Sequence, residues 1–181
     1  MVDLKKRSRK IKMLLMDVDG VMTDGGIILG SDGIELKRFH VQDGMGITLA
    51  KAAGLLVGIL TGRDSEAVRR RAEELGLDEV QQGFFHKEDG YRAILERYGL
   101  KDAEIAYMGD DVLDLPILKR VGLSICVANG TREAKRASHY ITKRRGGDGA
   151  VREVVEMLLK AMGKEKKVLA SILNRAREGR N

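Results

Sequence analysis

The stretch MLLMDVDGVMTDG at residues 13–25 runs from four apolar residues directly into two aspartates and a glycine. Residues 13–16 would be apolar on both faces of a pleat, which indicates a strand buried on both sides, as in a parallel sheet. Asp17 and Asp19 follow at its end, and Gly20 predicts an immediate turn. In open parallel sheets, ligands bind in a crevice at the carboxyl ends of the strands. We therefore expect the side chains of Asp17 and Asp19 to face such a crevice. A plain Asp-Gly turn without chemistry is the alternative for this stretch taken alone.

An alternation of short apolar runs and helical patterns continues to residue 162. The expected strands cover residues 13–16, 55–60, 79–82, 104–108, 123–127 and 139–142. The expected helices cover residues 46–53, 65–75, 88–98, 113–121, 132–137 and 150–162. Strands separated by helices of this length predict an α/β fold, with a Rossmann-like parallel sheet and helices on both faces.

One segment breaks this alternation. Residues 27–29 and 34–41 flank a turn sequence, GSDG, so we expect a small β-hairpin over residues 26–41, inserted after the first strand. The hairpin is too small to be a domain, and its apolar residues favour contact with a partner surface. The chain is therefore expected to divide into a basic N-terminal tail (1–11), one domain (12–163) and a basic, helix-forming C-terminal extension (164–181).

The positive charge of the chain is concentrated at its two ends. The 33 Lys+Arg and 27 Asp+Glu residues give a net charge of +6, yet the segment between residues 13 and 163 carries −3. A nucleic-acid-binding domain needs a basic face on its folded body, and often aromatic platforms, whereas aromatic residues make up 4% of this chain. We interpret the ends as solubilising tails and expect no nucleic-acid partner; a weak anionic partner is the alternative.

Apolar segments and cysteine content limit the location of the protein. No apolar stretch approaches the ~20 residues that a membrane span needs, and the run after the basic N-terminus is too short for a signal peptide. The single cysteine, Cys126, excludes an intrachain disulfide and fits a reducing compartment. We therefore expect a cytoplasmic protein with no membrane partner.

Two further motifs follow later strands. Thr61-Gly62-Arg63 offers a hydroxyl and a backbone N–H at a strand–helix turn, which suits an oxyanion, although such turns are common. Lys87 stands at the start of a helix, where a cation is unfavourable, so an anionic partner would explain it. An ordinary exposed lysine is the alternative.

The sequence GDDVLD at residues 109–114 follows the fourth strand and places three acids within five residues. Such acids repel one another unless a cation offsets them. Helix capping would account for Asp111, but it does not account for Asp110 and Asp114. This cluster favours a hard metal ion, and with the acids after the first strand it suits phosphoryl chemistry.

The four motifs, in this order at the carboxyl ends of strands, resemble those of the haloacid dehalogenase superfamily, whose members form an aspartyl phosphate. The resemblance extends from about residue 12 to residue 162. It implies that Asp17 is the nucleophile and that Asp19 protonates the leaving alcohol and then activates water. It also implies that Thr61 binds the phosphoryl oxygens and that Lys87 neutralises their charge.

The same resemblance implies a magnesium ion and a binding site for it. Mg²⁺ would be held by the Asp17 carboxylate, the Asp19 backbone carbonyl and Asp110, with Asp111 and Asp114 in support. Phosphoryl transfer by in-line displacement requires a metal ion, a cationic side chain and a hydrogen-bond donor around the phosphoryl group.

Members of the superfamily with a cap domain are larger, and this chain has room only for the hairpin. It therefore resembles the capless phosphatases, in which hairpins assemble a homotetramer and a neighbour helps to close the site. ELKRFHVQDGMG (35–46) and RGGDGAVREV (145–154) resemble stretches of the 3-deoxy-D-manno-octulosonate 8-phosphate (Kdo 8-phosphate) phosphatase family of lipopolysaccharide biosynthesis. This implies Mg²⁺-dependent hydrolysis of Kdo 8-phosphate, with residues 145–148 as a candidate contribution to a neighbour's site.

By position, the family resemblance also implies a set of substrate contacts. These are Asp19, His40, Val41, Gln42, Asp43, Gly44, Thr61, Gly62, Arg63, Arg71 and Lys87. Arg63 and Arg71 are eight residues apart, so a helix between them would place both on one side, where they suit a carboxylate or phosphate. Solvated helix charges are the alternative. Thr48 stands where some members have arginine, and the extension after Gly163 is outside the family pattern.

Three other functions are weighed against this one. The motifs fit a phosphatase for a nine-carbon sugar acid phosphate, of the sialic acid 9-phosphate type, equally well. A receiver-like phosphoacceptor module is disfavoured, because its acceptor aspartate lies on a middle strand and Asp17 follows the first. The third is a non-catalytic assembly or nucleic-acid partner that acts through the basic ends.

Overall fold

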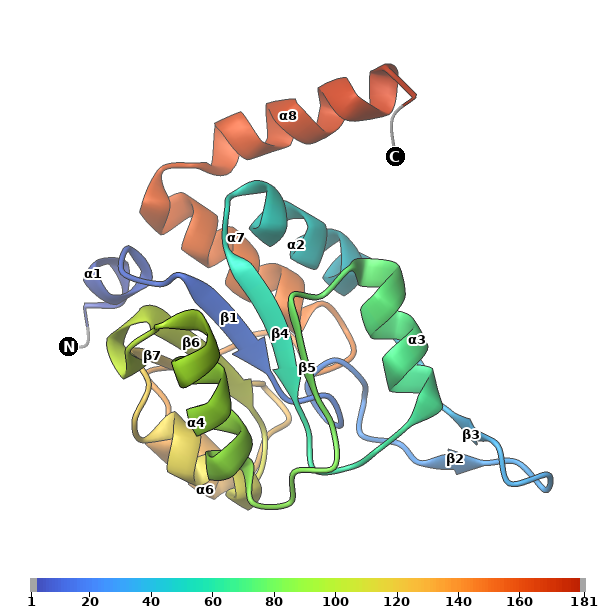
Figure 1. The fold of residues 1–181 in the computed structure, drawn as a ribbon. Coiled ribbons are helices and arrows are strands. Elements are labelled where there is room, and N and C mark those ends of the chain that lie inside the picture. Colours follow the sequence, from blue (N-terminus) through green and yellow to red (C-terminus); the bar gives the residue numbers. More distant parts are fainter. Residues whose placement is uncertain (1–2, 180–181) are drawn as a thin grey trace.

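The computed structural model describes residues 3–179, and a six-stranded parallel sheet with the strand order β5-β4-β1-β6-β7-β8 forms its centre (Figure 1). The strands are β1 (Met13–Met16), β4 (Leu56–Leu60), β5 (Glu79–Gln81), β6 (Ile105–Gly109), β7 (Leu123–Cys126) and β8 (Tyr140–Ile141). The parallel sheet confirms the expected fold class.

Strand β1 is the point at which the order of the sheet reverses. It pairs with β4 on one side and with β6 on the other, and all four of its residues are buried. The next strands along the chain continue outward from each side. In open α/β sheets this reversal leaves a crevice at the carboxyl ends of the strands. The residues after β1 therefore lie at the mouth of that crevice.

Helices cover both faces of the sheet, as predicted (Figure 1). One face packs with α2 (Val41–Ala52), α3 (Glu66–Leu75) and α7 (Ala150–Met162), and the other with α4 (Lys87–Tyr98), α5 (Leu115–Leu118) and α6 (Arg132–Ala137). Alternate residues of β1 divide between the two cores: Leu14 and Met16 face the first, Met13 and Leu15 the second. This division follows from the period of two in a strand.

The inserted hairpin is shorter than predicted, and the helix after it is longer. Strands β2 (Ile28–Leu29) and β3 (Glu35–Leu36) pair in antiparallel fashion, and α2 begins at Val41 rather than at residue 46. We expected residues 34–41 to form the second hairpin strand and the helix to begin at residue 46, whereas Gly44 and Gly46 lie within α2 in the structure. They are tolerated because α2 packs closely here: a Cβ at Gly46 would lie 3.0 Å from the Arg152 Cα.

Another difference concerns residues 113–121, which do not form the single helix expected. A 3₁₀ turn (Val112–Asp114) precedes the short α5, and Pro116 lies in the first turn of that helix as expected. Asp111 caps the 3₁₀ turn with its carboxylate. The acidic motif is thus a tight turn followed by a helix.

Both basic ends contain helices. In α1 (Leu4–Ser8), Leu4 contacts the core, and the Arg7 guanidinium donates a hydrogen bond to the Gly122 carbonyl at 2.6 Å. In α8 (Glu165–Arg177), Val168 is buried against the core and Leu173 is exposed. The predicted boundaries of the tails remain predictions, and residues 1–2 and 180–181 lie outside the described part. Within residues 3–179, no helix combines the length and apolar character needed to cross a bilayer.

Candidate active site

Three of the predicted motifs meet at the carboxyl edge of the sheet. Asp17 follows β1, Thr61 follows β4 and Asp110 follows β6, and these strands are hydrogen-bonded neighbours. Lys87 begins α4, which follows the adjacent strand β5. The order of the strands thus brings together residues from four separate parts of the sequence.

Lys87 connects two acids at the base of this site. Its ammonium lies 2.9 Å from Asp17 Oδ2 and 2.6 Å from Asp114 Oδ1, and its side chain is 3% exposed. Burial opposes its charge, but the two carboxylates raise the pKa of Lys87 above the usual value. It is therefore not an ordinary surface lysine: it is a fixed cation between buried carboxylates.

Asp114 organises the acidic turn. One carboxylate oxygen accepts hydrogen bonds from the Tyr107 hydroxyl and from Lys87, both at 2.6 Å, while the other accepts from the backbone N–H groups of Asp110 (2.8 Å) and Asp111 (3.2 Å). Tyr107 was not predicted as part of the site, and its place inside an apolar strand gave no signal. Asp111 points elsewhere, since its carboxylate accepts from Val112 N at 2.7 Å.

The residues present fit a divalent cation. Carboxylate oxygens of Asp17, Asp110 and Asp114 lie within 4.8 Å of one another. Burial raises the pKa of Asp17 to about 6, with Lys87 opposing and Asp114 adding to the shift. Burial, together with Asp17 and Asp114, raises the pKa of Asp110 to about 8. Clustered oxygens that favour a proton this strongly are suited to a hard cation such as Mg²⁺.

The turn after β1 is built around Gly20 and Thr23. Gly20 has φ +87°, and a Cβ there would clash with the Asp110 carboxylate, so only glycine fits. The Thr23 hydroxyl accepts from Gly20 N (3.3 Å) and from Gly25 N (3.2 Å), which closes the turn. Thr23 was not predicted as a site residue. Its position between two turn glycines was the available signal.

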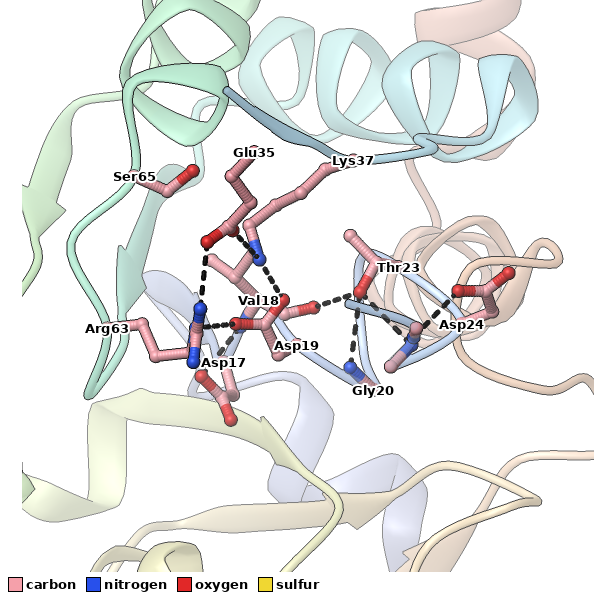
Figure 2. A network of polar contacts seen from close by, with 12 residues as sticks. Asp17, Val18, Asp19, Gly20, Thr23, Asp24, Glu35, Lys37, Arg63 and Ser65 are labelled. Carbon is pink, nitrogen blue, oxygen red and sulfur yellow. Dashed lines mark hydrogen bonds and ion pairs between the residues drawn. The ribbon is translucent and has the colours of Figure 1, made fainter. Parts of the chain in front are cut away.

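Asp19 belongs to a separate network of four charged groups (Figure 2). Lys37 Nζ lies 2.5 Å from Asp19 Oδ1 and 2.8 Å from Glu35 Oε1. Arg63 lies 3.6 Å from Asp19 Oδ2 and donates to Glu35 Oε2 at 2.8 Å. The Lys37 and Arg63 cations hold the pKa of Glu35 at about 2. Glu35 and Lys37 were not predicted as site residues; a charged pair two apart on a hairpin strand could have indicated them.

Residues 40–44, predicted to contact substrate, form the start of α2. His40 is its N-cap, and Val41 is 79% exposed. Asp43 is buried and accepts hydrogen bonds from Gly149 N (3.1 Å) and Arg152 N (2.9 Å), so it connects α2 to the start of α7. The Gln42 amide oxygen accepts from Arg144, and Gly44 lies against the Arg71 guanidinium.

The two predicted arginines do not share a helix side. Arg63 precedes α3, which begins at Glu66, so the spacing argument fails for this pair. Arg63 reaches Asp19, whereas Arg71 pairs with Glu74 at 2.8 Å and stacks over the Phe39 ring. Gly62, which neighbours Arg63, lies near the backbone of residues 84–85.

Residues 145–148 pack against the turn of their own chain. Gly147 N donates to the Val21 carbonyl at 2.9 Å, and Gly146 N donates to Asn129 Oδ1 at 2.7 Å. A Cβ at Gly146 would overlap the Gly20 carbonyl. This close approach requires the glycine pair, and it places the segment beside the Asp17–Asp19 turn.

Comparison with known proteins supports this arrangement. Residues 79–154 match the family model of haloacid dehalogenase-like hydrolases. The 3-deoxy-D-manno-octulosonate 8-phosphate phosphatase KdsC of Escherichia coli K12 is 40% identical over 162 residues, which cover 90% of this chain and 86% of that protein. The Moraxella catarrhalis phosphatase, whose crystal structure contains magnesium, phosphate and Kdo, has a TM-score of 0.92 at 40% identity, covering 95% of this chain and 99% of that one. The cobalt-bound Haemophilus influenzae phosphatase has a TM-score of 0.84 at 38% identity, and the match covers 87% of this chain and 92% of that one.

Proposed function

We propose that this chain, which belongs to the haloacid dehalogenase-like hydrolases and among them to the Kdo 8-phosphate phosphatases, hydrolyses Kdo 8-phosphate to Kdo and phosphate. The observation that carries the proposal is the buried Asp17–Lys87–Asp114 cluster at the point where the strand order reverses. There, one carboxylate faces the crevice beside a fixed cation. A phosphate monoester needs this combination of nucleophile and countercharge.

Asp17 is held ready to attack phosphorus. Its Oδ1 accepts from Val18 N at 2.7 Å and its Oδ2 pairs with Lys87, so the carboxylate has a single orientation. Attack forms an acyl phosphate on Asp17 and breaks the bond from phosphorus to the sugar oxygen. Lys87 offsets the negative charge near the reacting oxygens, and Thr61, at the end of β4, supplies a donor to the phosphoryl group. A bound Mg²⁺, held by Asp17, Asp110 and the Asp19 backbone carbonyl, would neutralise phosphoryl charge.

Asp19 handles the proton in both half-reactions. It donates a proton to the departing sugar alkoxide, and it then accepts one from the water that attacks the acyl phosphate. One residue separates it from the nucleophile, and the turn at Gly20 directs it to the same crevice. Arg63 lies beside Asp19 with a half-exposed side chain, which leaves it available to the substrate carboxylate.

A substrate panel tests this function. Phosphate release is measured from Kdo 8-phosphate, a nine-carbon sugar acid 9-phosphate and p-nitrophenyl phosphate, each with Mg²⁺ and with EDTA. We expect the highest kcat/KM with Kdo 8-phosphate and no turnover in EDTA. Equal or better turnover of the nine-carbon compound would overturn the substrate assignment.

Replacement of Asp110 tests the metal site through stability. Without a divalent cation, the raised pKa of Asp110 means that the folded chain holds this proton more tightly than the unfolded chain does, so ionisation destabilises the fold as pH rises. In EDTA we expect Asp110→Asn to gain stability over wild type between pH 5 and pH 8, reaching ~1–3 kcal/mol.

With Mg²⁺ present, we expect the wild-type chain to be more stable than Asp110→Asn, because only the wild-type chain gains the free energy of Mg²⁺ binding. Urea unfolding at pH 5, 7 and 8.5, with EDTA and with Mg²⁺, measures both effects. An Asp110→Asn variant that is stabilised by Mg²⁺ as much as wild type would place the ion elsewhere.

The hairpin supports a homotetramer as the active form. Ile27, Ile28, Leu29, Ile34 and Leu36 are all more than half exposed, and Leu29 reaches 70%. An apolar surface of this kind on a two-stranded projection needs a covering partner. The same proposal places the protein in the cytoplasm, since Cys126 is buried and unpaired.

Charge in the hairpin should break this assembly. We expect Ile28→Lys with Leu29→Lys to convert the tetramer to smaller species in light scattering coupled to gel filtration, because burying two lysines in an apolar interface is costly. Ser31→Lys, in the exposed turn between the strands, is the matched control and should remain tetrameric. A tetramer that survives the double substitution would show that the hairpin is not the interface.

A further inference from the structure

We propose that Lys37 is the positioning residue for the Asp19 carboxylate: by holding Oδ1, it leaves Oδ2 as the oxygen that transfers the proton. The inference rests on the proposed function in one respect, namely that Asp19 is the proton donor to the leaving alcohol. Lys37 itself touches neither the leaving oxygen nor phosphorus in this role.

The contacts of Asp19 distinguish its two oxygens. Lys37 Nζ lies 2.5 Å from Oδ1, within hydrogen-bond distance, whereas Arg63 Nε lies 3.6 Å from Oδ2, outside it. Figure 2 shows Lys37 and Arg63 approaching the Asp19 carboxylate from different sides. One oxygen is therefore fixed and the other is free to exchange a proton with a substrate.

Burial makes Lys37 a fixed element and Arg63 a movable one. The side chain of Lys37 is 1% exposed, while that of Arg63 is 46% exposed. A buried ammonium is stable only where carboxylates compensate its lost hydration, and Lys37 has Asp19 and Glu35 for this purpose. Arg63 is anchored on Glu35 at 2.8 Å and contacts Asp19 only loosely, so it can give up Asp19 for a substrate. Lys37 cannot, because its buried ammonium needs both carboxylates.

The local backbone explains why Lys37 reaches Asp19. Glu35 begins strand β3, which ends at Leu36, and Lys37 follows directly after it. The 2.8 Å contact between the Lys37 and Glu35 side chains puts them on the same side of the chain, while Leu36 between them is exposed. Glu35 thus supports Lys37 from the adjoining strand, and Lys37 reaches Asp19, in a turn eighteen residues earlier in the sequence. The hairpin therefore contributes one charged pair to the network around Asp19, beside exposed apolar residues such as Leu29 and Leu36.

The leaving group of the substrate separates this role from a structural one. p-Nitrophenolate departs without a proton, whereas a primary alkoxide needs one, and kcat/KM reports the steps up to alcohol release. We therefore compare kcat/KM for a primary alkyl phosphate with that for p-nitrophenyl phosphate. Lys37→Met should lower the alkyl-to-aryl ratio by about tenfold or more, within the range of a general acid's contribution.

Three variants complete the design. Lys37→Arg retains the cation and should restore the ratio to within about threefold of wild type. Arg38→Met, which removes the neighbouring and largely exposed cation paired with Asp24, is the matched control and should leave the ratio unchanged. Thermal unfolding checks each fold; if Lys37→Met does not fold, Lys37→Gln replaces it, and its ratio should also fall.

Equal losses with both substrates, or no loss with either, would overturn the role of Lys37. Equal losses would make it a packing or substrate-binding residue. Neither substrate in the ratio is Kdo 8-phosphate, so a wrong substrate assignment leaves this test intact. Failure of the sugar-phosphate panel and failure of Lys37 as a positioning residue are therefore distinguishable.

Discussion

Asp17→Asn is expected to lower kcat with Kdo 8-phosphate by on the order of 10⁴-fold or more, because it removes the nucleophile of a covalent mechanism. The fold should survive the change. Asp17 is buried near Asp110 and Asp114, and its carboxylate adds to their repulsion, so a neutral amide relieves strain among like charges. Lys87 keeps Asp114 as its partner at 2.6 Å.

The measurement is steady-state phosphate release, with urea unfolding in EDTA on the same preparation. Asp89→Asn is a matched control, since Asp89 lies in the first turn of α4 with an exposed side chain and pairs only loosely with Arg92, at 3.8 Å. It should keep wild-type activity. An Asp17→Asn protein with activity within tenfold of wild type would remove Asp17 from the nucleophile's role.

Lys87→Met is expected to affect both activity and stability. It leaves Asp17 and Asp114 buried without their shared cation, and loss of one partner from a buried ion pair costs about 3–5 kcal/mol. Activity should fall by on the order of 10³-fold, because the cation that offsets phosphoryl charge is lost. Urea unfolding and kcat/KM measure the two effects, with exposed Lys119→Met as the control.

A second substitution separates the two effects. Asp114→Asn added to Lys87→Met removes one uncompensated charge, and the amide can still accept from the backbone N–H groups of Asp110 and Asp111. We expect part of the lost stability to return and none of the activity. Recovery of activity in the double variant would mean that Lys87 acts only through the fold.

The sequence predicted those features that depend on local pattern. Residues 13–16 form β1 as expected, because four consecutive apolar residues ending at an Asp-x-Asp-Gly turn have few alternatives. The crevice could be anticipated from the same turn, since strand ends of a parallel sheet meet at one edge. The meeting of Asp17, Lys87 and Asp110 then follows from the topology.

Features that depend on tertiary contacts were missed. The start of α2 was wrong because residues 34–41 were expected to form a strand. The contacts that hold the first turn of α2 come from far along the chain: Asp43 accepts from Gly149 N and Arg152 N, which are 106 and 109 positions away. Lys37 was taken as part of an ordinary hairpin, because its partner Asp19 lies on a different turn. Arg63 and Arg71 were expected to lie on one side of a helix. This was wrong because α3 begins at Glu66, after Arg63.

The central claim is that phosphate passes through Asp17, and trapping the acyl phosphate tests it most directly. Wild-type protein and an Asp19→Asn variant are mixed with p-nitrophenyl phosphate and Mg²⁺, quenched in acid and reduced with borohydride. Because p-nitrophenolate departs without a proton, the variant should still form the intermediate and be slow only in its hydrolysis. Reduction converts a phosphoaspartate to homoserine, which peptide mass spectrometry locates. We predict homoserine at position 17, with a larger yield in the Asp19→Asn variant. Turnover without modification at position 17, or modification at another carboxylate, would contradict the account.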